Sequence, residues 1–467
     1  MYNKLTLCII LLCSIALSQT ISTNFSQSTL EKDLPLLYLS KNRIPHNLSS
    51  SFLSNIRYSQ FNKKQNLLFV SNIFITDKEI KLFEVGVKYN FKSNQLILGM
   101  IDDKNNETLS LNEHIIFGNN HEPIKRLTIQ SNDYMLFPWG KDSSFWKNIF
   151  FSYNFTHGIL DKNHTYFWNE YYGRQLREIY YSEAPFLHRK QLHIKINIKE
   201  SLNLKIGFNH AALWGGTLVN LYTNTTKKYS NDFDSFYRTV FWKGGTKAYD
   251  RNDIVGGVIG NHLGSIDFAV IKKSKKIKTT YYYQHIFEDG GSFWFDNKFD
   301  GLWGINLKNN NLDSLLNEVT LEFLNTKHQS GNIHPDGVDS YFWHDQYPAG
   351  WQYKGVSIGS LFINPSQNRS QIYFLSTRVK IKENLTFDSH IGYGKIYHYY
   401  GFKDWHIPID TYFENDYQGK YKSIFLSLNS KTKNNIEIKY DIALEKNLES
   451  ETIKFFNIKI SKYFLLY

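Results

Sequence analysis

The feature that most constrains the fold is a regular alternation of apolar and polar residues with a period of two. Residues 192–198 place Leu or Ile at every second position, and residues 202–208 repeat the pattern after a short polar break. Successive side chains of a strand point to opposite faces, so each segment predicts a strand and the pair predicts a hairpin with a tight turn. The same alternation recurs in residues 85–91, 319–323, 379–381, 385–387 and 436–444.

The polar face of these strands often carries charge. In residues 436–444, Ile, Tyr and Leu occupy one parity, whereas Glu437, Lys439 and Asp441 occupy the other. A soluble sandwich would pack such apolar faces together. A membrane barrel would turn them to lipid around a polar lumen.

Three features favour the barrel. The N-terminus indicates export, aromatic residues make up 16% of the chain and cluster near strand ends, and the chain ends on an aromatic run at residues 463–467. At about 25 residues per strand with its connection, we expect an all-β, antiparallel transmembrane outer-membrane β-barrel of roughly 16–18 strands.

The first residues predict a secretory signal peptide. Lys4 precedes an apolar core at residues 5–17, and small residues follow near Ser18. The two cysteines of the chain, Cys8 and Cys13, lie in this segment. Residues 1–18 are therefore expected to be removed, which leaves an exported chain that makes no disulfide.

The rest of the chain is expected to have two parts. Residues 19–65 lack clean alternation, and we expect them to form a periplasmic or lumen-plugging segment. Residues 66–467 carry the alternating segments and are expected to form the barrel.

The chain is basic, with a net charge of +11 that is spread along its length. Without a recognition motif, this charge does not predict nucleic-acid binding. An acidic polysaccharide or an anionic lipid leaflet suits the sign equally well. We hypothesise that Lys and Arg at lumen-facing or loop positions help to hold an acidic glycan.

Short runs between Pro185 and Pro365 combine Trp, His, carboxylate, amide and Gly at predicted strand ends. Sugars stack on aromatic rings and exchange hydrogen bonds with carboxylates and amides. The structural alternative is that Trp and Tyr form interface girdles and that Asp-Gly and Gly-Gly form turns. The candidate stacking residues are Trp214, Trp294, Trp303, Trp343 and Trp351, and the candidate hydroxyl partners are His210, His285, Glu288, Asp289, Asp300 and Asp345.

Catalytic alternatives are weaker. A glycosidase needs two nearby carboxylates. Glu288, Asp289 and Asp300 could supply them, although spacing in sequence does not show it. Residues 296–301 resemble a calcium loop, but Lys298 occupies a position that requires an oxygen ligand. We therefore expect a protein without catalytic residues, metal or cofactor.

Taken together, the central motifs resemble the capsule assembly Wzi family of outer-membrane proteins in its Bacteroidetes-type version. The matching stretches are His188 with the strand after it and residues 210–216, 260–265, 283–290, 300–305, 322–331 and 350–355. Several short motifs in one order are more specific than any one of them.

The resemblance implies an outer-membrane barrel with a polar, largely occluded interior and a helical or plug-like periplasmic part. It also implies binding of capsular or extracellular polysaccharide and a role in its assembly or attachment at the cell surface. Expected partners are that polysaccharide, outer-membrane lipid or lipopolysaccharide, and the polysaccharide export machinery. A porin-like solute channel and an outer-membrane hydrolase stay open as alternatives.

Overall fold

The computed structural model describes most of the chain. The described residues are 18–28, 34–42, 52–62, 65–76, 79–101, 110, 112, 114–118, 120–138, 146–160, 164–167, 179–220, 224–243, 254–255, 258–288, 290–311, 313–329, 340–344, 346–347, 349–363, 368–397, 417–432, 434–446 and 452–466. The predicted signal peptide lies outside them, apart from Ser18.

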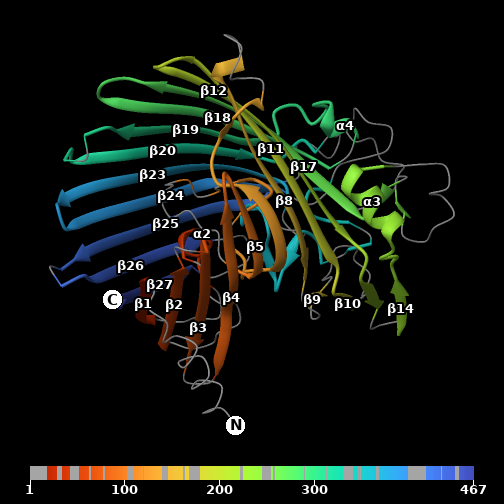
Figure 1. Cartoon of the computed structure of the whole chain (residues 1–467), viewed down its shortest axis with the longest axis horizontal. Coiled ribbons are helices and arrows are strands. Elements are labelled where there is room, and N and C mark those ends of the chain that lie inside the picture. Colours follow the sequence, from red (N-terminus) through yellow and green to blue (C-terminus); the bar gives the residue numbers. More distant parts are fainter. Residues whose placement is uncertain are drawn as a thin grey trace.

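Eighteen antiparallel strands of the described part form a closed ring (Figure 1). Each strand pairs with two neighbours, and the ring closes where β1 pairs with both β2 and β27. The ring strands are β1 (Ser18–Ser28), β2 (Phe52–Asn62), β3 (Leu67–Ile75), β4 (Ile80–Phe91), β5 (Asn94–Met100), β6 (Lys125–Ser131), β8 (Ile149–Ile159), β11 (Phe186–Lys199), β12 (Leu202–Trp214), β17 (Asn261–Lys273), β18 (Ile277–Phe287), β19 (Gly301–Asn309), β20 (Leu316–Asn325), β23 (Ser370–Lys382), β24 (Leu385–Tyr397), β25 (Tyr417–Lys431), β26 (Ile436–Lys446) and β27 (Ile453–Leu466). A short strand, β7 (Met135–Leu136), pairs with β8 beside β6. The expected antiparallel barrel and its strand number are confirmed.

The two ends of the barrel differ in the length of their connections. Short turns join β4 to β5, β11 to β12 and β23 to β24, whereas β5–β6, β12–β17 and β20–β23 are joined by long segments at the opposite end. Gln19 pairs with Leu466, so the first and last strands meet near the short-turn end. Figure 1 shows the short hairpins on the left with the C-terminus. Outer-membrane barrels place short turns toward the periplasm and long loops outside, so we assign the long-loop end to the cell exterior.

The expected division at residue 65 does not separate wall from plug. β1 and β2 belong to the ring, with β1 paired along its whole length to β2 and β27. Between them, α2 (Leu36–Lys41) lies inside the barrel, where the Tyr38 ring contacts Phe455 at 4.2 Å. The sequence of β1 is mostly polar and shows no alternation of apolar and polar residues. β1 is held in the ring by backbone hydrogen bonds to both of its neighbouring strands.

The alternation seen in the sequence becomes two faces of one wall. In β26, Ile442 and Leu444 are exposed on the outside, whereas Asp441 and Glu445 are buried inside. We call the first set outward-facing and the second lumen-facing. A lipid-facing apolar surface around a polar interior is the pattern of a transmembrane barrel.

The lumen is filled near the long-loop end. The described residues within 110–124 and 340–363 fold into it, and several of their side chains join a buried cluster with the wall. Ile115, Phe342 and Trp351 from these segments belong to this cluster, together with lumen-facing wall residues that include Leu263, Ile286 and Leu302. We call residues 110–124 and 340–363 the first and second plug segments.

Most of the remaining elements lie at the long-loop end. They are α3 (Phe233–Phe241), α4 (Gly290–Phe293), a sheet of β9 (His164–Phe167), β10 (Ile179–Glu183), β13 (Thr217–Asn220) and β14 (Thr225–Lys228), and the pairs β15–β16 (Ile254–Val255, Val258–Ile259) and β21–β22 (Gln352–Tyr353, Val356–Ser357). A 3-10 turn at Trp146–Asn148 precedes β8 at the short-turn end. Asp232 caps α3 by accepting the Ser235 backbone N–H at 2.7 Å. Among the described residues, none of the helices has the length and apolarity that a membrane crossing requires.

Candidate functional site

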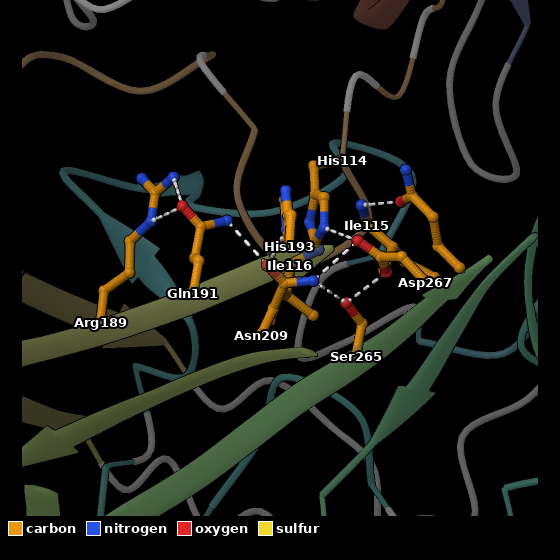
Figure 2. Close-up of polar contacts among 10 residues, drawn as sticks. His114, Ile115, Ile116, Arg189, Gln191, His193, Asn209, Ser265 and Asp267 are labelled. Atoms are coloured by element: carbon orange, nitrogen blue, oxygen red, sulfur yellow. Dashed lines mark hydrogen bonds and ion pairs between the residues drawn. The ribbon is translucent and has the colours of Figure 1, made fainter. Parts of the chain in front are cut away.

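A polar network on the lumen wall holds the first plug segment (Figure 2). Asn209 of β12 lies at its centre. The Asn209 amide donates to Ser265 at 3.0 Å and to Asp267 at 2.7 Å, and its oxygen accepts from Gln191 at 2.8 Å. His193 Nε2 lies 2.9 Å from the same oxygen. Two side chains from β11 and two from β17 are thereby held around Asn209 of β12.

His114 joins the first plug segment to this network. Its Nδ1 accepts the Ile116 backbone N–H at 3.3 Å, so Nε2 carries the proton that it shares with Asp267 at 2.9 Å. Next to it, the Ile115 N–H donates to Gln284 Oε1 at 2.7 Å. The wall thus satisfies the Ile115 backbone N–H of a buried loop, which would otherwise lack a partner.

A buried glutamate holds the same segment on the other side. Glu322 of β20 accepts from Ser110 Oγ at 2.5 Å and from Tyr282 OH at 2.8 Å. The Tyr282 ring lies on the inner face of the wall directly over Gly304, where an added Cβ would lie 2.0 Å from the ring. Glycine at this position makes the close approach possible.

The two plug segments are bonded to each other. The Trp351 indole N–H donates to the Ile116 carbonyl at 2.9 Å, and the Ser360 backbone N–H donates to the Ile115 carbonyl at 2.8 Å. Ser360 Oγ also donates to Asn112 Oδ1 at 2.6 Å. The plug is therefore one connected body and not two independent loops.

Glu122 of the first plug segment pairs with one lysine of the wall and one lysine of the second plug segment. Its carboxylate lies 2.5 Å from Lys81 Nζ of β4 and 2.8 Å from Lys354 Nζ of the second plug segment. Burial alone would raise the pKa of Glu122, but the hydrogen bonds and charges of the two lysines outweigh it and lower the pKa. The group therefore stays ionised and paired.

Two of the predicted carboxylates accept hydrogen bonds from the start of the second plug segment. Asp300 is fully buried and accepts the backbone N–H groups of His328 and Gln329 and the Tyr341 hydroxyl, at 3.1, 2.7 and 3.1 Å. Burial raises the pKa of Asp300 to about 7 despite these donors. Glu288 accepts the Phe342 N–H at 2.6 Å. Both are structural acceptors here, and Asp289 and Asp345 lie outside the described residues.

Several predicted sugar-binding residues are outward-facing and covered. His210 shares the parity of the exposed Ile206 in β12, and its Nε2 lies 2.9 Å from His262 Nδ1. Trp214 has the same parity and packs against Phe186 at 4.9 Å between ring centroids. Neither side chain reaches the lumen or solvent, so the expected joint sugar surface is not assembled.

The other candidates are scattered. His285 is buried under α4, where its Nε2 lies 2.8 Å from the Ser292 carbonyl. Trp303 stacks on Tyr283 at 4.0 Å on the outer face, as an interface girdle would. Trp294 is exposed, Trp343 is half-buried and Trp351 is fully buried in the plug.

The sequence reasoning missed His114, Glu122, Asn209 and Asp267. Parity was the available signal for Asn209, which follows the recognised segment 202–208, and the alternation of Ile266 and Phe268 around Asp267 offered the same signal in a segment that was not recognised as a strand. His114 and Glu122 lie in a segment without regular structure and give no such signal. Among the described residues, no cluster of three or more His, Cys, Asp or Glu side chains has the arrangement of a metal site.

Comparisons with known proteins identify the family. The family model of capsule assembly protein Wzi matches residues 20–376, well beyond the central motifs that carry the resemblance. Curated proteins give no significant match.

Among solved structures, the chain is similar to Wzi of Escherichia coli, described as an outer membrane protein involved in group 1 capsule assembly and a carbohydrate-binding β-barrel. That likeness has a TM-score of 0.60 at 12% identity and covers 99% of this chain and 88% of the other. OccK3 (OpdO) of Pseudomonas aeruginosa gives a TM-score of 0.49 at 9% identity, with 96% of each chain covered. The family match spans more than half of the sequence, and this chain, with its outer-membrane type of β-barrel, belongs to the capsule assembly protein Wzi family.

Proposed function

We propose that this outer-membrane barrel binds capsular or extracellular polysaccharide and assists its assembly or attachment at the cell surface. The family match supports this role. The observation that carries it is the bonded plug. Trp351 and Ser360 link the second plug segment to the first, and buried side chains of both segments pack against the lumen wall. A barrel with this interior suits a fixed binding platform better than a solute channel.

A binding role suits the carboxylates better than a catalytic role. A glycosidase needs two accessible carboxylates that face one bond. The oxygens of Asp300 are engaged with three donors away from solvent, and Glu288 holds a backbone amide of the plug. We therefore propose that the protein holds polysaccharide without cleaving it.

Lumen-facing lysines support an acidic ligand. Lys195 of β11 lies directly opposite Lys205 of β12, and both ammonium groups lie 4.9 Å from the Tyr134 ring. Lys278 of β18 is likewise opposite Lys308 of β19. Like charges in opposite cross-strand positions destabilise a sheet. Both pairs lie near the short-turn end, so an acidic polysaccharide that enters the lumen from the periplasmic side of the plug would relieve this repulsion.

The double substitution Lys195→Gln/Lys205→Gln is expected to weaken binding of acidic capsular polysaccharide about tenfold at low salt, since each partly exposed charge contributes up to about 1 kcal/mol. Binding to immobilised polysaccharide checks this, with neutral dextran as a comparison. Lys275→Gln/Lys276→Gln, in the exposed turn between β17 and β18, makes the same charge change outside the lumen and should leave binding unaltered. Affinity that is equal at low and high ionic strength would remove charge from the proposal.

Cells that lack the protein are expected to shed capsular polysaccharide that wild-type cells retain, with total synthesis unaltered. The retained and shed fractions are measured after gentle centrifugation, and expression of the intact chain should restore retention. Unaltered retention in the deletion strain would count against attachment. We propose lipopolysaccharide and the polysaccharide export machinery as further partners, because the first surrounds a barrel in the outer leaflet and the second delivers the chain to be held.

A further inference from the structure

α3 lies on the outside of the barrel wall. His210 and His262 share the outward-facing parity of Ile206 and Phe268 in β12 and β17, and both histidine rings lie against Trp242 at the end of α3, at 5.4 and 6.1 Å. Lys190 of β11, also outward-facing, donates to the Val240 carbonyl of α3. A polar, histidine-rich part of the outer wall is thereby covered by a helix.

The wall alone provides a short apolar band in this sector. The outward-facing run from Leu202 to Phe208 spans about 20 Å of β12 at about 3.3 Å per residue. The strand tilt shortens it further along the membrane normal, whereas a barrel's apolar band is about 25 Å tall. The histidines follow directly above this run, at the level that α3 covers.

α3 presents three different faces. Ser235, Thr239 and Val240 are buried against the wall, whereas Phe233 and Phe241 are 80% and 59% exposed. Phe233, Tyr237 and Phe241 follow at intervals of four residues, so they form one aromatic stripe. We call these three residues the aromatic stripe of α3.

The third face is charged. It carries Asp234 and Arg238, which form an ion pair at 2.8 Å. Next to the stripe, Lys243 Nζ donates to Tyr237 OH at 3.0 Å. An aromatic stripe beside a charged face, on a helix whose third face is bound to the wall, is the pattern of a helix that lies in a membrane interface.

Trp242 fixes the orientation of the stripe. It ends α3 in the left-handed conformation with a φ of 50°, which is costly for a large side chain. Its ring stacks on Phe287 at 5.8 Å and meets Phe293 of α4 edge-on at 5.9 Å. These contacts hold α3 beside α4 on the same outer sector.

α4 extends the same surface. Trp294 and Phe299, which follow α4, are 76% and 70% exposed, and Lys298 between them is exposed as well. Phe295 stacks on the outward-facing His285 at 3.9 Å, so this segment also covers a polar part of the wall.

We infer that α3 and the segment after α4 complete the lipid-facing band, with their exposed aromatic residues in the outer leaflet of the membrane. Two observations select lipid as the occupant. The aromatic surface continues the apolar band of β12 and β17 upward, and Lys243 and Lys298 beside it match the phosphate groups of an outer leaflet. The inference is independent of polysaccharide binding, because it concerns the outside of the wall.

Single-cysteine labelling tests the inference in the full-length protein. After Cys8→Ser and Cys13→Ser, Phe241→Cys or Trp294→Cys is labelled with an environment-sensitive fluorophore. The protein is then reconstituted in vesicles of phosphatidylcholine and phosphatidylglycerol. Doxyl-labelled lipid should quench both labels several-fold more strongly than aqueous iodide does.

Two controls frame the result. A label at Ile206→Cys in the apolar band should behave like the test positions, and a label at Lys228→Cys on exposed β14 should respond to iodide only. Heat-dependent gel mobility verifies that each variant has folded. Iodide quenching at positions 241 and 294 as strong as at 228 would overturn the inference. Shielding from both quenchers would overturn it too, since a second protein surface would then cover the stripe.

Discussion

Replacing Trp351 with alanine is expected to open a conducting path through a barrel that is otherwise closed. Trp351 is fully buried in the plug, and its indole N–H donates to the Ile116 carbonyl at 2.9 Å. Truncating a buried Trp costs about 3–5 kcal/mol, and here it also leaves the Ile116 carbonyl without its donor. Because the wall is held by its own ladder of backbone hydrogen bonds, the loss falls on the plug. Planar-bilayer recordings should show sustained conductance for Trp351→Ala and none for the wild type.

Matched variants separate plug loosening from unfolding. Trp294→Ala removes an exposed Trp and should leave the bilayer silent, while Trp351→Phe keeps most of the ring volume and should conduct less than Trp351→Ala. Heat-dependent gel mobility reports on the integrity of each barrel. A folded Trp351→Ala protein that does not conduct would show that the plug does not depend on this residue. Strong conductance of the wild type would favour the channel alternative over a binding platform.

The wall could be predicted from the sequence because its signal is local. The alternation in β26 survives in the structure as an exposed Ile442 beside a buried Asp441. Period-two patterns depend only on neighbouring residues, so no contact distant in sequence is needed to read them. β1 escaped detection because its mostly polar sequence gives no such pattern.

The site could not be predicted in the same way. The contact between Ser110 and Glu322 joins residues 212 positions apart, and no periodicity indicates it. The residue type of His210 predicts a sugar partner, whereas its parity with Ile206 places it on the outer face. Composition indicates which chemistry is present, but only parity and long-range contacts show which side of the wall it occupies.

The buried Asp300 predicts an unusual pH dependence for the stability of the protein. Burial raises the pKa of this carboxyl from 3.8 to about 7. Below the unfolded value, both states hold the proton and the folded state is not penalised. As the pH rises through the window from 3.8 to about 7, the unfolded chain releases the proton while the folded chain keeps it. The free energy of unfolding should therefore fall by about 4 kcal/mol across this window, at about 1.4 kcal/mol for each pH unit.

Asp300→Asn should remove this part of the pH dependence, because an amide does not titrate. Urea unfolding in detergent at about pH 5 and about pH 8 measures it, with the difference between wild type and variant isolating Asp300 from other titrating groups. Asp313→Asn is the matched control, since Asp313 is exposed and only pairs with Lys380 at 2.7 Å. The Asn amide brings N–H donors to a site that already offers three, so the variant should also be less stable than the wild type at low pH. Parallel pH profiles for wild type and Asp300→Asn would mean that the carboxyl is ionised in the folded protein and that its burial is relieved by a partner.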